Sequence, residues 1–92
     1  MESICLDNNF ELSFEKLPHT VRLIVLKDGE EWVCRKEKLA NLFSFIEVDQ
    51  RFLFKGRLQL FKRDGEIVVQ VRNTIIGTFS NQTFTEALNK LK

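Results

Sequence analysis

The sequence has few of the residues from which metal and catalytic sites are built. Its 92 residues include one histidine, His19, and two cysteines, Cys5 and Cys34, which lie far apart. No C-x-x-C pair is present, so the sequence predicts neither a metal-ligand cage nor a disulfide framework. Catalysis needs a nucleophile with a base, paired carboxylates in a pocket, or a metal set. We therefore expect free thiols, no cofactor, no metal and no enzymatic activity.

Long apolar runs, proline and glycine are also scarce. No run approaches the roughly 20 residues of a membrane helix, and the first residues lack the basic start and apolar stretch of a secretory signal. The single proline and four glycines leave no linker or phosphate-binding loop to propose. With 43% hydrophobic residues and nine phenylalanines the chain can bury a core. We expect residues 1–92 to form a single domain that is cytoplasmic and does not enter a membrane.

The charge that is present is distributed unevenly. Residues 1–50 hold 6 basic and 10 acidic side chains, a balance of −4, whereas residues 51–92 hold 8 and 3, a balance of +5. The net charge of +1 therefore hides a dipolar chain.

In the first half of the sequence, apolar and polar residues first alternate as in β-strands and then take the spacing of an α-helix. Apolar residues alternate with polar ones from 10 to 17, residues 20–27 are mostly apolar, and an Asp-Gly turn at 28–29 leads to a strand at 31–35 that Trp32 is expected to anchor. Leu39, Leu42, Phe43 and Ile46 then have the spacing of an amphipathic helix.

The second half of the sequence also has a strand-like spacing of apolar residues followed by a helical one. Strands are predicted at 51–63 and 66–72, joined by a second Asp-Gly turn, and at 75–79. Thr83 and Glu86 have the spacing of a capping box, before a helix whose apolar stripe is Phe84, Ala87, Leu88 and Leu91. We predict an α+β fold: a mainly antiparallel sheet of five to six strands, in the order βββ-α-βββ-α, with two short helices packed on one face.

The stretch IIGTFSNQTFTEAL, residues 75–88, is similar to the end of the DNA-binding domains of plant ethylene-response factors and of phage integrase arm-binding domains. A strand, Gly-x-Phe, a short turn and a helix opening follow one another in the same order. The tryptophans and dense arginines of those families are missing from the preceding strands. The resemblance therefore implies the same strand-to-helix arrangement and no shared function.

Alternation divides the long strand at 51–63 into two faces. Phe52, Phe54, Leu58 and Leu60 are predicted to face the core, with Ile67, Val69 and Val71 from the returning strand. The opposite face and its rim are basic and partly apolar. The candidate binding residues there are Lys55, Arg57, Gln59, Phe61, Lys62, Arg63, Val68, Gln70 and Arg72.

Two functions are compatible with this face. We expect a small non-enzymatic binding protein, of the adaptor, inhibitor or viral accessory type, that binds a protein partner through the basic and apolar sheet face; an acidic protein is one candidate. The alternative is a regulator that binds nucleic acid through the same hairpin. This alternative is less favoured because Phe61 is the sole aromatic residue on the predicted face, and single-stranded nucleic-acid binders stack several bases on aromatic rings. A homodimer is also compatible with the sequence, because one layer of two helices leaves one side of a single sheet uncovered.

Overall fold

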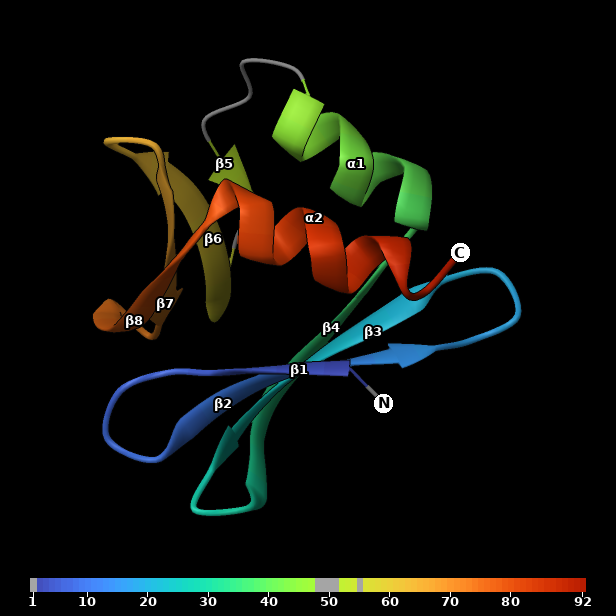
Figure 1. Cartoon of the computed structure of the whole chain (residues 1–92). Coiled ribbons are helices and arrows are strands. Elements are labelled where there is room, and N and C mark those ends of the chain that lie inside the picture. Colours follow the sequence, from blue (N-terminus) through green and yellow to red (C-terminus); the bar gives the residue numbers. More distant parts are fainter. Residues whose placement is uncertain (1, 48–51, 55) are drawn as a thin grey trace.

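The chain folds as two successive units of four strands and a helix (Figure 1). The computed structural model describes residues 2–47, 52–54 and 56–92. The first unit comprises β1 (Glu2–Cys5), β2 (Phe10–Lys16), β3 (Val21–Lys27), β4 (Glu30–Glu37) and α1 (Leu39–Glu47). The second comprises β5 (Phe52–Leu53), β6 (Leu58–Arg63), β7 (Glu66–Val71), β8 (Thr74–Ser80) and α2 (Asn81–Asn89).

Each unit forms its own antiparallel sheet, with strand orders β1-β2-β3-β4 and β5-β6-β7-β8. Four of the connections contain two successive residues with positive φ, as tight hairpin turns require. These pairs are Asn8-Asn9, Asp28-Gly29, Asp64-Gly65 and Arg72-Asn73.

The α+β class is confirmed, but the prediction of one sheet of five to six strands is wrong. The prediction omitted β1, which pairs with β2 across the Asn8-Asn9 turn. It also treated 51–63 as one strand, whereas the chain leaves the extended conformation at Phe54, where φ is 72°, and resumes pairing at Leu58. The order is therefore ββββ-α-ββββ-α, in two sheets.

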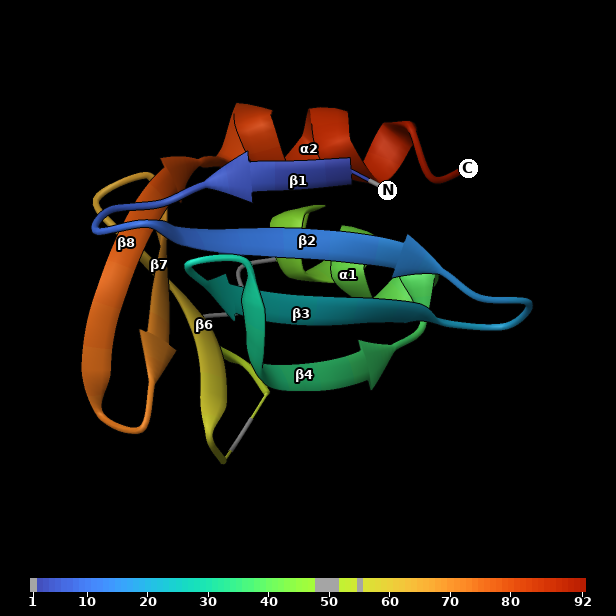
Figure 2. The same ribbon diagram turned by 90° about the horizontal axis from the view of Figure 1, so that it is seen from below.

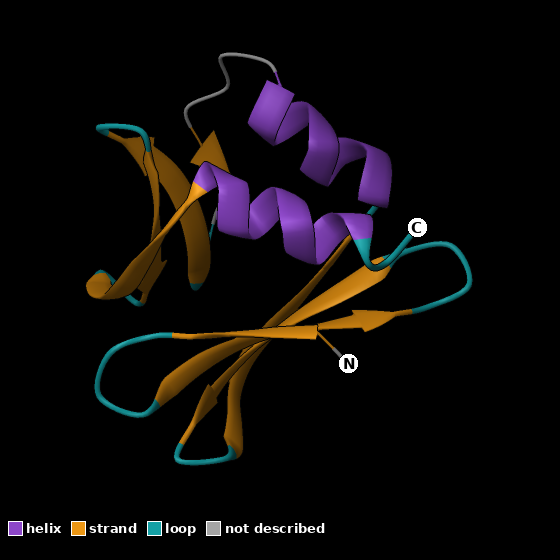
Figure 3. Ribbon diagram, viewed as in Figure 1, coloured by secondary structure: helices purple, strands orange, loops and turns teal. Residues whose placement is uncertain are grey.

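Both helices lie in the angle between the inner faces of the two sheets (Figures 1 and 3). In Figure 2, α1 lies behind the first sheet and α2 runs alongside β1 at its edge. One core cluster joins all these elements. Phe84 of α2 is fully buried, and its ring centroid lies 5.8 Å from Phe14 of β2, 6.3 Å from Phe45 of α1 and 5.5 Å from Phe79 of β8. Phe84 thus links both sheets and both helices, and the predicted stripe of α2 is confirmed.

A glycine marks one place where the sheets meet closely. A Cβ atom on Gly77 of β8 would lie 2.9 Å from the Cβ of Leu6, in the connection between β1 and β2. Glycine at position 77 therefore permits the second sheet to approach the first.

The start of α2 differs from the prediction. Ser80, and not Thr83, is the N-cap: its hydroxyl oxygen accepts a hydrogen bond of 3.0 Å from the backbone N–H of Thr83. The helix begins earlier because β8 continues to Ser80 and runs into α2 without a loop. Within the described residues, neither helix has the length and apolar character needed to cross a lipid bilayer.

Candidate functional site

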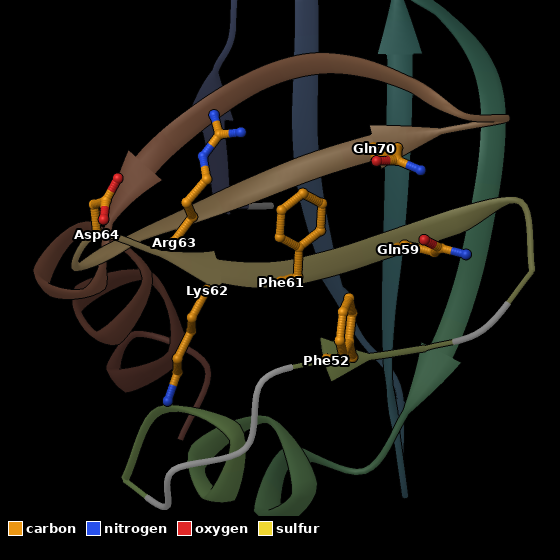
Figure 4. A pocket seen from close by; sticks show the side chains of 7 residues that line it. All are labelled: Phe52, Gln59, Phe61, Lys62, Arg63, Asp64 and Gln70. Carbon is orange, nitrogen blue, oxygen red and sulfur yellow. The ribbon is translucent and has the colours of Figure 1, made fainter.

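An open hollow lies on the outer face of the second sheet, the face turned away from the helices. It has a volume of about 540 Å³ and lies over β5, β6 and β7 (Figure 4). Its lining residues are Phe52, Gln59, Phe61, Lys62, Arg63, Asp64 and Gln70. We call the group formed by Phe52, Gln59, Phe61, Arg63 and Gln70 the aromatic face. The structure thus brings together Gln59, Phe61, Lys62, Arg63 and Gln70, all predicted from the sequence.

Phe52 was assigned to the core from the sequence, and that prediction is wrong. Its side chain is 55% exposed, and Leu53 is buried in its place. Phe54 and Gly56 have positive φ, so the regular alternation of inward and outward side chains does not continue from β6 to β5. Phe52 therefore points to the face opposite the one that alternation predicts. Gly56, an isolated glycine within the predicted strand, was the sequence signal for this break in the strand.

The aromatic face therefore carries two rings. Phe52 pairs in register with Phe61, and their ring centroids lie 5.8 Å apart at an interplanar angle of 43°. In Figure 4 both rings project from the sheet toward the viewer, beside the amides of Gln59 and Gln70, which face each other across β6 and β7. The objection that a single aromatic residue occupies this face no longer holds.

Two other predicted residues, Lys62 and Val68, differ from the expectation. Lys62 points toward α1 (Figure 4), where its ammonium group donates a hydrogen bond of 3.2 Å to the carbonyl of Ile46 and lies 5.1 Å from the ring centroid of Phe45. Val68, in register with Phe61, is only 1% exposed and cannot contact a ligand. Lys55 lies outside the described residues. Lys62 and Val68 therefore support the sheet from which the face projects.

The remaining two predicted residues, Arg57 and Arg72, lie at the far end of the same pair of strands. The backbone N–H of Arg72 donates a hydrogen bond of 2.9 Å to the carbonyl of Arg57, and both side chains are exposed. At the opposite end Arg63 is in register with Glu66 and adjoins Asp64. The outer face is therefore more strongly cationic at the Arg57–Arg72 end.

The first sheet provides an internal comparison, because its strands have the same order and matching register. Where the second sheet has the row Phe52, Phe61 and Val68, the first has Ser3, Ser13 and Ile24. The neighbours of Phe61 on its face, Gln59 and Arg63, correspond to Glu11 and Glu15. An outer face of this architecture thus forms without aromatic rings, so folding alone does not account for Phe52 and Phe61.

The outer face of the first sheet has the opposite charge character. Arg22 forms ion pairs with Glu15, at 3.3 Å, and with Glu31. The side chain of Cys34, followed by these two carboxylates, raises the pKa of Arg22 above its ordinary value, so its charge persists at every working pH. Two carboxylates therefore engage the guanidinium within the protein, and Lys36 is in register with Arg22 on β4. This face is unsuited to an anionic ligand.

The described residues contain no group of three or more His, Cys, Asp or Glu side chains placed to hold a metal ion. Both cysteines are free and exposed. Comparisons with known protein families, with curated proteins and with solved structures found no match to this chain.

Proposed function

We propose that the protein is a non-enzymatic binding protein whose aromatic face binds single-stranded nucleic acid. The observation that carries the proposal is the ring pair formed by the exposed Phe52 and the half-buried Phe61. Aromatic rings on an open surface stack on unpaired bases, and each stacked base contributes roughly 1 to 3 kcal/mol. A duplex cannot use such rings in this way, because its bases are stacked on one another.

The polar groups around the rings suit the same ligand. Gln59 and Gln70 place two amides beside the rings, and an amide can both donate to and accept from the edges of bases. Arg57, Arg63 and Arg72 are exposed at the two ends of the face, where guanidinium groups can pair with phosphates. Glu11, Glu15 and Glu31 on the outer face of the first sheet disfavour binding of phosphates there.

A titration with labelled oligonucleotides tests the proposal. We expect single-stranded oligonucleotides to bind more tightly than duplexes of the same sequence, and Phe52→Ser to weaken binding by roughly 5- to 100-fold. Phe52 is more than half exposed, so this change leaves the unfolding midpoint in urea nearly unaltered. Leu26→Ser, on the outer face of the first sheet, is the matched control and leaves the affinity unchanged. Absence of binding at low salt contradicts the proposal.

A protein partner is the second candidate, and it is favoured by a different observation. Phe52 and Ile75 are 55% and 47% exposed, and both belong to the second sheet. Exposed apolar side chains beside arginine are typical of protein interfaces. If the face binds a protein instead, the same titration shows no oligonucleotide binding at low salt.

A further inference from the structure

Trp32 is an exposed aromatic residue at a backbone irregularity of the first sheet. It occupies the irregularity in the pairing of β4 with β3, where Val25 faces Val33 and Leu26 faces Glu31. The matching irregularity in the second sheet holds Ile76, which is 4% exposed and belongs to the core. Trp32 is instead 41% exposed, with its ring centroid 5.2 Å from that of Phe10. One side of a large ring is thus held by the protein while much of it stays accessible.

Arg72 is held in a conformation that arginine rarely adopts. Its φ of 50° lies in the left-handed region, which favours glycine, asparagine and aspartate. The three other tight turns of this kind place Asn8, Asp28 and Asp64 at the corresponding first position. Because a residue in an unfavourable conformation requires compensation, Arg72 is a candidate for a functional role.

Arg72 also connects Trp32 with the aromatic face. Its guanidinium carbon lies 5.9 Å from the ring centroid of Trp32, on the other sheet. Its backbone N–H donates a hydrogen bond to the carbonyl of Arg57, and Arg57 precedes Phe61 by four residues. At 3.3 Å per residue, that separation is about 13 Å. Two aromatic platforms, one on each sheet, are therefore separated by a short stretch that carries two arginines.

From these contacts we infer that the binding site for single-stranded nucleic acid continues from the aromatic face across the sheet junction to Trp32. Phe52 and Phe61 stack on bases at one end, Trp32 stacks on a base at the other, and Arg57 and Arg72 pair with the phosphates between them. This inference rests on the proposed function and specifies it further. The ligand is a strand long enough to reach both platforms.

Trp32 is the only tryptophan, so its fluorescence reports directly on this end of the site. We would titrate the full-length protein with oligothymidylates of about four, eight and sixteen nucleotides. The anisotropy of a labelled oligonucleotide measures affinity, and the emission of unlabelled complexes measures contact with Trp32. The longer strands are expected to quench Trp32, whereas a strand that reaches the Phe52–Phe61 pair alone leaves the emission unchanged.

Two variants separate contact from folding. Arg72→Asn places a residue suited to positive φ in the turn, so we expect an equal or higher melting temperature together with a loss of about tenfold or more in affinity for the longer strands. Trp32→Leu is expected to lower the affinity for the same longer oligonucleotides by roughly 5- to 100-fold. Lys36→Asn removes one positive charge from β4 without touching the junction, and it is the matched control for Arg72→Asn.

The outcomes distinguish this inference from the proposed function. If Phe52→Ser weakens binding but Trp32 is not quenched, and Trp32→Leu and Arg72→Asn bind like the wild type, the site ends at the aromatic face and the inference is wrong. If no oligonucleotide binds at any length, the proposed function fails as well. Quenching by the longer strands, with selective losses in both variants, supports the inference.

Discussion

Two adjacent cations on β6, Lys62 and Arg63, have different surroundings and should have different roles. The ammonium of Lys62 bonds to the carbonyl of Ile46 in the last turn of α1, where the helix dipole favours a positive charge. Arg63 is exposed at the rim of the aromatic face. Alternation along the strand explains the difference, because Lys62 has the same parity as the buried Leu58 and Leu60.

We therefore predict that Lys62→Met lowers the free energy of unfolding by about 1 kcal/mol and leaves oligonucleotide affinity unchanged, since a dipole contact and a cation–π contact each contribute about 0.5 to 1 kcal/mol and methionine retains the apolar stem. Arg63→Met should lower the oligonucleotide affinity and leave the free energy of unfolding unchanged. Urea denaturation and the oligonucleotide titration, applied to both variants, measure the two effects. A loss of affinity in Lys62→Met equal to that in Arg63→Met would show that Lys62 also contacts the ligand.

Among the elements, those with uninterrupted periodicity could be predicted and those with backbone breaks could not. The stripe of Phe84, Ala87 and Leu88 located α2, because nothing interrupts its spacing. Phe52 was placed on the wrong face because a positive φ at Phe54 reverses the alternation; the spacing of apolar residues does not show this reversal, and Gly56 was its sequence signal. The contact between Trp32 and Arg72 joins two sheets and has no local signal at all.

The start of α2 gives a prediction at the same scale. Because Ser80 accepts from the N–H of Thr83, Ser80→Ala should lower the free energy of unfolding by about 1 kcal/mol. Thr83→Ala should cost less, since the Thr83 hydroxyl is exposed and bonds to the Ser80 hydroxyl at 2.9 Å, leaving the cap itself intact. Urea denaturation of both variants is the measurement. A larger loss for Thr83→Ala would restore the capping box that the sequence suggested.

For the whole molecule, the arrangement of two sheets removes the premise from which a homodimer was suggested. That argument assumed one sheet with an uncovered apolar side, whereas the helices fill the angle between two sheets and share one core. Exposed large apolar side chains of the second sheet are Phe52 and Ile75, and a stable interface takes about 20 to 30 residues a side. We therefore expect a monomer in sedimentation at micromolar concentration. A dimer that Phe61→Glu dissociates would show that the aromatic face is instead a self-association surface.

The charge distribution of the whole molecule also predicts how binding responds to salt. If Arg57, Arg63 and Arg72 each pair with one phosphate, the slope of log K against log salt concentration should be near −2, since each contact with a single strand contributes about −0.7. Affinity should then fall by about 20-fold between 50 and 200 mM salt. Replacing Arg57 with alanine should reduce the slope by about 0.7, whereas Phe52→Ser should lower the affinity at every salt concentration and leave the slope unchanged. A slope near zero for the wild type would mean that these arginines do not pair with phosphates.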